Sequence, residues 1–203
     1  MSRQPRPERK APNVVVIGLV SMVFFILVGV LLANILRHES LLPRLALNGV
    51  GVALGLAGAV VCFVLAAAMY LSWPALRAVS DATAAKAVQV SLAQFGWLGL
   101  IFSVTLPPIG EEVFFRGALQ PSIGLVPAAL LFGLSHGGWG KSSWPYAVSA
   151  AVSGLVIGWV FQQTGSLSAS MISHLVFNIG VSACMAKGWW PFKTGAASVG
   201  TDS

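Results

Sequence analysis

Long apolar runs separated by short polar stretches dominate the chain. The first two runs, residues 14–36 and 45–71, carry no charged residue. A helix needs about 20 apolar residues to cross a bilayer, so each run predicts a membrane span. The first run is longer than the apolar core of about 7–15 residues in a cleavable signal peptide, and we interpret it as an uncleaved span. Gly51 and Gly55 predict a face for close helix packing in the second.

Four further apolar segments follow a polar helix or loop that contains Arg77, Asp81 and Lys86. They cover residues 87–120, 122–136, 144–164 and 167–186. The first of these would be about 51 Å long as one straight helix, whereas the hydrocarbon core is about 30 Å thick. Pro107-Pro108 is therefore predicted to break or kink it, with a new helix starting at Pro108. The pattern predicts an all-α, polytopic transmembrane bundle with about six apolar helical segments.

Composition agrees with a membrane protein. Of the 203 residues, 56% are hydrophobic and 9% are charged, whereas a soluble domain carries about 25% charged residues. The net charge of +6 is spread along the chain rather than gathered on one face, so we expect the lipid bilayer and no nucleic acid as a partner. Nothing in the sequence specifies an oligomeric state.

The basic residues predict the orientation. With the N-terminus inside, and if residues 87–120 cross the membrane once, the positive-inside rule is satisfied. The cytoplasmic side then receives Arg3, Arg6, Arg9, Lys10, Arg77, Lys86, Lys141, Lys187 and Lys193, and the outer side receives Arg37 and Arg44. We therefore predict a multi-pass protein of the cell membrane with both termini in the cytoplasm.

Candidate chemistry lies between Lys86 and Lys141, where the only charged residues are Glu111, Glu112 and Arg116. A charge at bilayer depth costs about 2.5–3.5 kcal/mol on insertion scales, so three together indicate a functional site. Glu112 and Arg116 are four residues apart and can pair on one helix face. Glu111 points elsewhere and is left for reaction. The predicted break places both carboxylates in the first turn of a helix, whose dipole favours the ionised form that a general base needs.

Two histidines and an asparagine extend this site. His136 and His174 lie in apolar segments, and Asn178 shares a helix face with His174. Together with the two glutamates, these groups can activate water and stabilise an oxyanion. Each feature alone also has a structural interpretation, as an ion pair, an interface histidine or hydrogen bonding between helices. Phe132 is interpreted as a packing residue against the His136 ring.

Three motifs in order resemble one known family. Glu111-Glu112-Val-Phe-Phe-Arg116, Phe132-Gly-Leu-Ser-His136 and His174-Leu-Val-Phe-Asn178 match the patterns EExxxR, FxxxH and HxxxN. These are typical of the CPBP intramembrane proteases, the CAAX prenyl protease and bacteriocin-processing (Abi) family. The resemblance covers roughly residues 95–186. It implies a helical bundle with a polar, water-accessible intramembrane cavity.

The resemblance also implies roles for the motif residues. Glu111 would be the general base that activates water, and His136 would hold or polarise that water. His174 and Asn178 would stabilise the oxyanion, with Glu112 and Arg116 as supporting residues. Glu111, His136 and His174 could instead ligate a divalent metal such as zinc. The absence of a His-Glu-x-x-His motif slightly favours a reaction without metal.

The function implied is that of an intramembrane endopeptidase acting on membrane-associated protein or peptide substrates, in CAAX-type or bacteriocin-type processing. A non-catalytic membrane scaffold or immunity protein, and a small proton-coupled transporter, remain alternatives. The chain is divided into a basic cytoplasmic N-terminal tail (1–13), two spans with a connecting helix (14–94), a CPBP-like protease domain (95–186) and a polar C-terminal tail (187–203).

Overall fold

The computed structural model describes residues 13–137, 140 and 142–192. The predicted basic tail up to residue 12, and the C-terminal tail beyond Phe192, lie outside these described residues. Within them the chain forms helices and no strand, as predicted. Lys187 still belongs to the last helix, and the side chain of Phe192 is buried against Phe63 and Tyr70. Residues 187–190 are exposed, and Pro191 and Phe192 are the first buried residues after α7.

Nine helical elements follow one another along the described chain. They are α1 (Val14–Arg37), the 3-10 helix η1 (Leu42–Leu45), α2 (Gly49–Ser72), α3 (Pro74–Glu112), the π-helix η2 (Val113–Leu119), α4 (Gln120–Ile123), α5 (Leu125–Ser135), α6 (Trp144–Thr164) and α7 (Leu167–Lys187). Five segments of the described chain are long and apolar enough to cross a membrane, and α5 is a shorter apolar helix. The protein is a multi-pass membrane protein, and the predicted number of about six apolar segments is confirmed.

Polar side chains and glycines define where the helices begin and end. The side chains of Asn13, Asn48 and Ser166 accept hydrogen bonds from the first backbone N–H groups of α1, α2 and α7. These caps satisfy donors that have no partner inside the helix. Gly165 and Gly188 end α6 and α7 with φ of 63° each, in the left-handed region that glycine adopts without strain.

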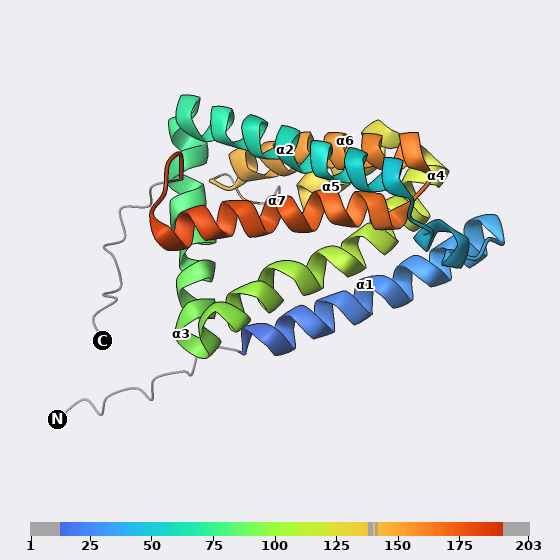
Figure 1. The fold of residues 1–203 in the computed structure, drawn as a ribbon, viewed down its shortest axis with the longest axis horizontal. Helices are drawn as coiled ribbons and strands as arrows, with labels where there is room; N and C mark the ends of the chain where they lie inside the picture. The colour runs from blue at the N-terminus through green and yellow to red at the C-terminus, as the bar shows by residue number, and fades with distance from the viewer. Residues whose placement is uncertain (1–12, 138–139, 141, 193–203) are drawn as a thin grey trace.

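The predicted break at Pro107-Pro108 is wrong, because α3 continues through both prolines. The helix instead breaks at Phe95 (φ −144°, ψ 20°) and Gly96 (φ 58°, ψ −148°). Gly96 has no Cβ and therefore accepts this backbone conformation. Residues 74–94 cross one end of the bundle, and the second half of α3 then runs alongside α1 (Figure 1).

The position of the break changes the electrostatics of the two glutamates. Glu111 and Glu112 are the last two residues of α3, and the chain continues directly into η2. They do not lie in the first turn of a helix, so the predicted support from a helix dipole is wrong. The compensation of their charge must come from neighbouring side chains.

Residues 74–94 form the polar helix predicted around Arg77, Asp81 and Lys86, and hydrogen bonds attach it to the bundle. Arg77 Nε donates to the carbonyl of Tyr70 at 3.2 Å, and the Tyr70 hydroxyl donates to Asp81 at 2.8 Å. At the other end of this segment, the Gln94 side chain accepts from the backbone N–H of Val14 at 3.0 Å. The segment is thus fixed to both α2 and α1.

Glycines let the helix backbones approach closely. A Cβ at Gly55 would lie 2.7 Å from the carbonyl oxygen of Ala169 in α7, which confirms the predicted packing face on α2. A Cβ at Gly110 would lie 2.6 Å from the carbonyl oxygen of Met22. Real side chains do not tolerate such distances, so α1 rests directly against the helical turn that precedes Glu111.

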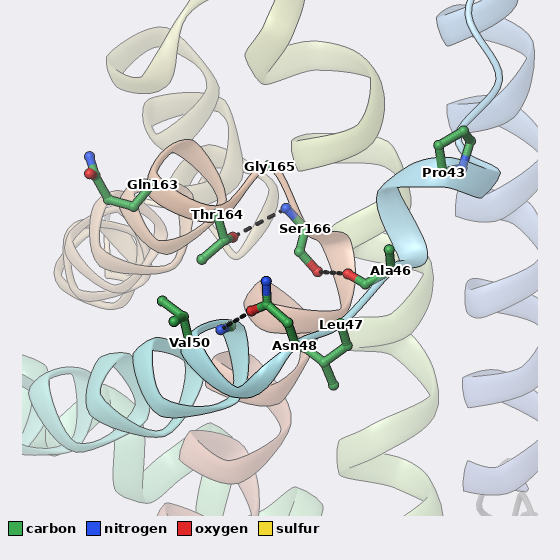
Figure 2. Close-up of a pocket in the computed structure, with 10 residues that line it drawn as sticks. Pro43, Ala46, Leu47, Asn48, Val50, Gln163, Thr164, Gly165 and Ser166 are labelled. Atoms are coloured by element: carbon green, nitrogen blue, oxygen red, sulfur yellow. Dashed lines mark hydrogen bonds between the residues drawn. The ribbon is translucent and has the colours of Figure 1, made fainter.

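The two ends of the bundle differ in character. α1 begins and α7 ends beside residues 74–94, whereas η1, α4 and the turn between α6 and α7 lie at the opposite end (Figure 1). At that opposite end, a hollow of about 310 Å³ is lined by uncharged residues (Figure 2). There the Ser166 hydroxyl donates to the carbonyl of Ala46 at 2.6 Å, which ties the loop before α2 to α7. This hollow contains none of the predicted site residues.

Candidate active site

A larger cavity of about 750 Å³ lies between residues 74–94 and the rest of the bundle. Most of its lining is apolar and comes from α1, α2, α3, α5, α6 and α7. Four of the predicted catalytic residues line it: Glu111, His136, His174 and Asn178. The structure therefore brings together residues that are up to 67 positions apart in the sequence.

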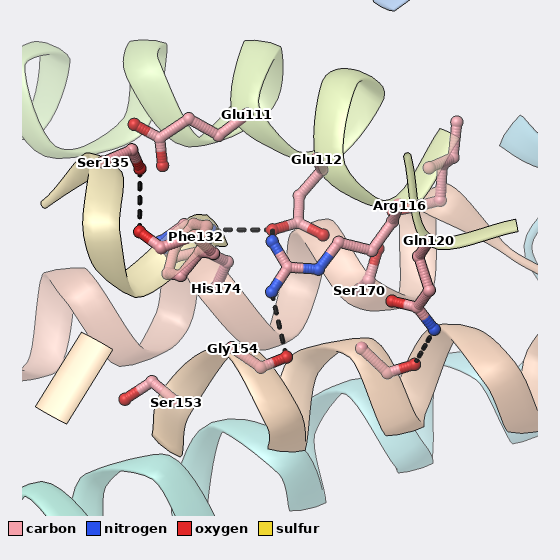
Figure 3. Close-up of polar contacts among 12 residues, drawn as sticks. Glu111, Glu112, Arg116, Gln120, Phe132, Ser135, Ser153, Gly154, Ser170 and His174 are labelled. Atoms are coloured by element: carbon pink, nitrogen blue, oxygen red, sulfur yellow. Dashed lines mark hydrogen bonds and ion pairs between the residues drawn. The ribbon is translucent and has the colours of Figure 1, made fainter. Parts of the chain in front are cut away.

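Glu112 is enclosed on the far side of the helix in a tight polar cluster. Its Oε1 accepts from Arg116 Nη1 at 3.0 Å and lies 2.8 Å from His174 Nδ1 (Figure 3). Arg116 Nη2 also donates to the carbonyl of Gly154 at 3.1 Å. The side chains of Glu112 and Arg116 are 0% and 2% exposed. The predicted Glu112–Arg116 pair is confirmed, and neither residue lines the cavity.

The contact with Glu112 determines which ring nitrogen of His174 carries a proton. A carboxylate can only accept, so Nδ1 carries the proton that it donates to Glu112. The Nε2 of a neutral His174 is then an acceptor, and it becomes a donor only in the imidazolium form. Glu112 is therefore the group that would stabilise a protonated His174.

Glu111 points the other way, toward α5. Its Oε2 lies 3.8 Å from His136 Nε2, and the two side chains are 13% and 25% exposed. His136 Nδ1 is 2.8 Å from the backbone carbonyl of Phe132, so Nδ1–H donates there and Nε2 faces Glu111 as an acceptor when the ring is neutral. The 3.8 Å separation is too long for a direct hydrogen bond, but one water molecule could contact both groups.

Phe132 lies between the two clusters. Its ring centroid is 4.4 Å from that of His136 and 5.6 Å from that of His174, and the Arg116 guanidinium lies 4.6 Å from its centre. The predicted packing of Phe132 against His136 is confirmed. Phe132 lines the cavity, whereas Arg116 does not.

Asn178 lines the cavity one helical turn after His174. Its side-chain Nδ2 lies 3.5 Å from the backbone carbonyl of Val104 in α3. The carboxamide has a second N–H that this contact leaves for the cavity.

The sequence prediction missed the contacts that anchor the motif helix to α6. Arg116 donates to the carbonyl of Gly154, and Gln120 donates to the carbonyl of Gly158 at 2.8 Å. Both pairs are spaced by four residues, so two polar side chains on one helix match two glycine positions on the other. That matched spacing is a signal in the sequence.

The π-helix η2, which carries Arg116, could not be predicted from any such spacing, although π-helical turns are frequent at functional sites.

The proposed metal ligands do not form a metal site in the described part of the chain. No three His, Cys, Asp or Glu side chains lie close enough together there to hold an ion. Glu111 and His136 are near each other, but His174 does not join them in a group of three possible ligands among the described residues. These donors do not fit a zinc centre, and we derive no step through a metal.

Comparisons with known proteins agree with the motif pattern. Residues 92–180 match the family described as type II CAAX prenyl endopeptidase, Rce1-like. The chain is 32% identical over 88 residues to the uncharacterized protein YpbD of Bacillus subtilis, and the match covers 43% of this chain and 46% of that relative. The chain thus spans about half the length of that relative. No solved structure matches. Residues 92–180 are therefore similar to the Rce1-like family of CAAX prenyl endopeptidases, in agreement with the resemblance of the three motifs.

Proposed function

We propose that the protein is an intramembrane endopeptidase that uses a water molecule activated by Glu111 and His136. One observation carries this proposal: Glu111 and His136 face each other across 3.8 Å at the wall of the cavity, whereas the neighbouring Glu112 is fully enclosed. A general base must reach a water or substrate, and Glu111 can do so. The family match to endopeptidases supports the same activity.

The reaction would proceed by direct attack of water on the peptide carbonyl carbon. Glu111 takes a proton from the water as its oxygen forms the new C–O bond, while His136 Nε2 orients the water. The resulting tetrahedral intermediate carries its charge on the former carbonyl oxygen. When the C–N bond breaks, Glu111 returns the proton to the leaving amine nitrogen. Water adds across one peptide bond, and no redox change occurs.

The oxyanion would be stabilised from α7. His174 can donate from Nε2 only as the imidazolium, which the Glu112 carboxylate at Nδ1 would support. The second N–H of Asn178 is the other donor that this helix face offers. Hydrogen-bond donors held in place before the reaction are worth about 10²–10³ in kcat each in other acyl-transfer enzymes.

The cavity and its place in the fold support a proposal for the substrate class. The lining is mostly apolar, and the protein crosses the membrane several times. We propose a membrane-associated protein or peptide whose cleaved segment carries apolar groups, as in CAAX-type or bacteriocin-type processing. We also propose the cell membrane as its location with both termini in the cytoplasm. Arg77 and Lys86 belong to residues 74–94, and Lys187 is the last residue of α7. Residues 74–94 and the end of α7 lie at the end of the bundle where α1 begins (Figure 1), as the positive-inside rule expects.

The test compares protein termini in membranes from cells with the wild-type chain, Glu111→Gln and Glu39→Gln. Glu39 is an exposed carboxylate of the loop between α1 and α2, paired with Arg44, so its replacement is a matched control. We expect termini that are produced by the wild type and by Glu39→Gln and that disappear in Glu111→Gln. Unchanged termini with Glu111→Gln would contradict the proposed mechanism and favour a scaffold role.

A further inference from the structure

The two prolines of α3 leave backbone carbonyls without their usual helical partners. In an α-helix, each N–H donates to the carbonyl four residues earlier. Proline has no N–H, so Pro107 leaves the carbonyl of Ser103 free and Pro108 leaves the carbonyl of Val104 free. α3 nevertheless continues as a helix through both prolines to Glu112. Within a membrane, such a freed carbonyl needs another donor.

Asn178 supplies that donor for one of the two carbonyls. Its Nδ2 lies 3.5 Å from the Val104 oxygen, across the interface between α7 and α3. The Val104 carbonyl is the one that Pro108, and not Pro107, leaves free. The match between a missing N–H and an amide from another helix is specific to this register.

We infer that Asn178 is a positioning residue, whose amide replaces the hydrogen bond that Pro108 removes and so fixes the helical turn that presents Glu111. Pro108 is buried and precedes Glu111 by three residues, so both belong to one turn. A change in the direction of this turn moves the Glu111 carboxylate relative to His136, 3.8 Å away. The effect on Glu111 rests on the proposed protease function, whereas the hydrogen bond itself does not.

This inference gives Asn178 two separate tasks. One N–H is directed to the Val104 carbonyl, and the other is left for the cavity as a donor to the reacting oxygen. An aspartate at the same position would accept rather than donate and could not serve the carbonyl. If Asn178 is a positioning residue, the effect of replacing it depends on whether residue 108 is proline. If Asn178 only donates to the substrate, its replacement has the same effect in both cases.

The test is a set of paired substitutions in the purified full chain in detergent. Asn178→Ala is made in the wild type, in Pro108→Ala and in Pro107→Ala. Alanine at position 108 restores an N–H for Val104 and makes the Asn178 amide dispensable there. At 3.5 Å the bond is long, so we expect Asn178→Ala to lower Tm by about 2–4 °C in the wild type. The loss should be under about 1 °C with Pro108→Ala and unchanged with Pro107→Ala.

Equal losses of Tm in all three backgrounds, or no loss in any, would overturn the inference. Asn178→Leu, which keeps a branched side chain of similar size without donors, repeats the comparison if Asn178→Ala does not fold. Ser182→Ala, one turn further along α7 and also in the cavity wall, is the control and should show no coupling to Pro108.

The kinetic constants of cleavage test the positioning of Glu111 separately from the stability of the fold. With cleavage of a substrate from the termini comparison, Asn178→Ala should lower kcat more than it changes KM, and Pro108→Ala should recover part of kcat in the double variant. Recovery of Tm without any recovery of kcat would overturn the positioning of Glu111. Failure of the protease proposal itself would leave no cleavage in the wild type, while the Tm comparison would still report on the hydrogen bond.

Discussion

Glu111 and Glu112 are neighbours in the sequence but occupy opposite environments. Glu112 is fully enclosed and shares its Oε1 between Arg116 and His174. Glu111 faces a cavity, and its Oε2 lies 3.8 Å from His136 Nε2. About 100° of helix rotation separates the two side chains. The difference shows that one turn of helix can hold one enclosed, charge-compensated carboxylate and one carboxylate that reaches a cavity.

The largest expected effect on stability comes from removing one partner of the enclosed Glu112–Arg116 pair. Arg116→Met leaves the Glu112 carboxylate buried without its main counter-charge, and removing one partner of a buried pair costs about 3–5 kcal/mol. We expect a corresponding loss in the free energy of unfolding, measured by denaturant unfolding in detergent. Adding Glu112→Gln should recover part of the loss, because the unpaired charge is removed. Wild-type stability of Arg116→Met would show that the enclosed pair does not support the fold.

A substitution at Glu111, which faces the cavity, should instead lower the cleavage activity. Glu111→Gln keeps the shape of the side chain but cannot accept a proton, and general-base catalysis contributes about 10²–10⁴-fold in rate. We expect cleavage to fall by at least that factor in the purified variant, with Tm close to that of the wild type. A large loss of Tm with activity per folded molecule retained would reverse the assignment of the two glutamates.

His174 contacts the enclosed Glu112 and His136 faces Glu111, so replacing each histidine tests the same difference between the two glutamates. His174→Ala removes a hydrogen bond to a buried carboxylate and should lower the free energy of unfolding by about 1–3 kcal/mol as well as cleavage. His136→Ala should reduce cleavage with a smaller loss of stability, because its ring is partly exposed in the cavity wall. Thermal unfolding and cleavage are measured on the same samples. Equal stability losses for both variants would contradict the division of the site.

The smallest expected effect is that of metal removal. The described residues bring no three ligands together, and the proposed reaction needs only Glu111, His136 and water. We expect a chelator such as EDTA to leave the cleavage rate of the purified protein unchanged. A loss of activity that is restored by added zinc would show that a metal takes part and would contradict the reaction proposed here.

Local spacing in the sequence was enough to predict several of these features. The lengths of the apolar runs predicted the spans, and the four-residue spacing of Glu112 and Arg116 predicted their pair. Contacts between distant segments could not be derived in this way. The hydrogen bond from His174 to Glu112 and the amide of Asn178 at Val104 depend on how α7 packs against α3.

The position of the helix break illustrates the same limit. Pro107-Pro108 is the stronger local signal for a break, because proline removes a donor and crowds the preceding turn. In the structure, a side chain from another helix serves the Val104 carbonyl, and the chain turns at Gly96 instead. The local preference did not decide the fold here, and the side chain at the Val104 carbonyl comes from 74 positions away in the sequence.

The wall that residues 74–94 build across the end of the bundle has a consequence for protein engineering. Leu76, Ser80 and Val88 line the cavity from this segment, and Val14 and Ile17 line it from α1. All five precede residue 92, where the match to the protease family begins. A chimera that grafts residues 92–180 onto other membrane helices would carry the three motifs but would lack two sides of the chamber around Glu111. A graft that keeps the whole cavity wall must therefore include residues outside the region of family similarity.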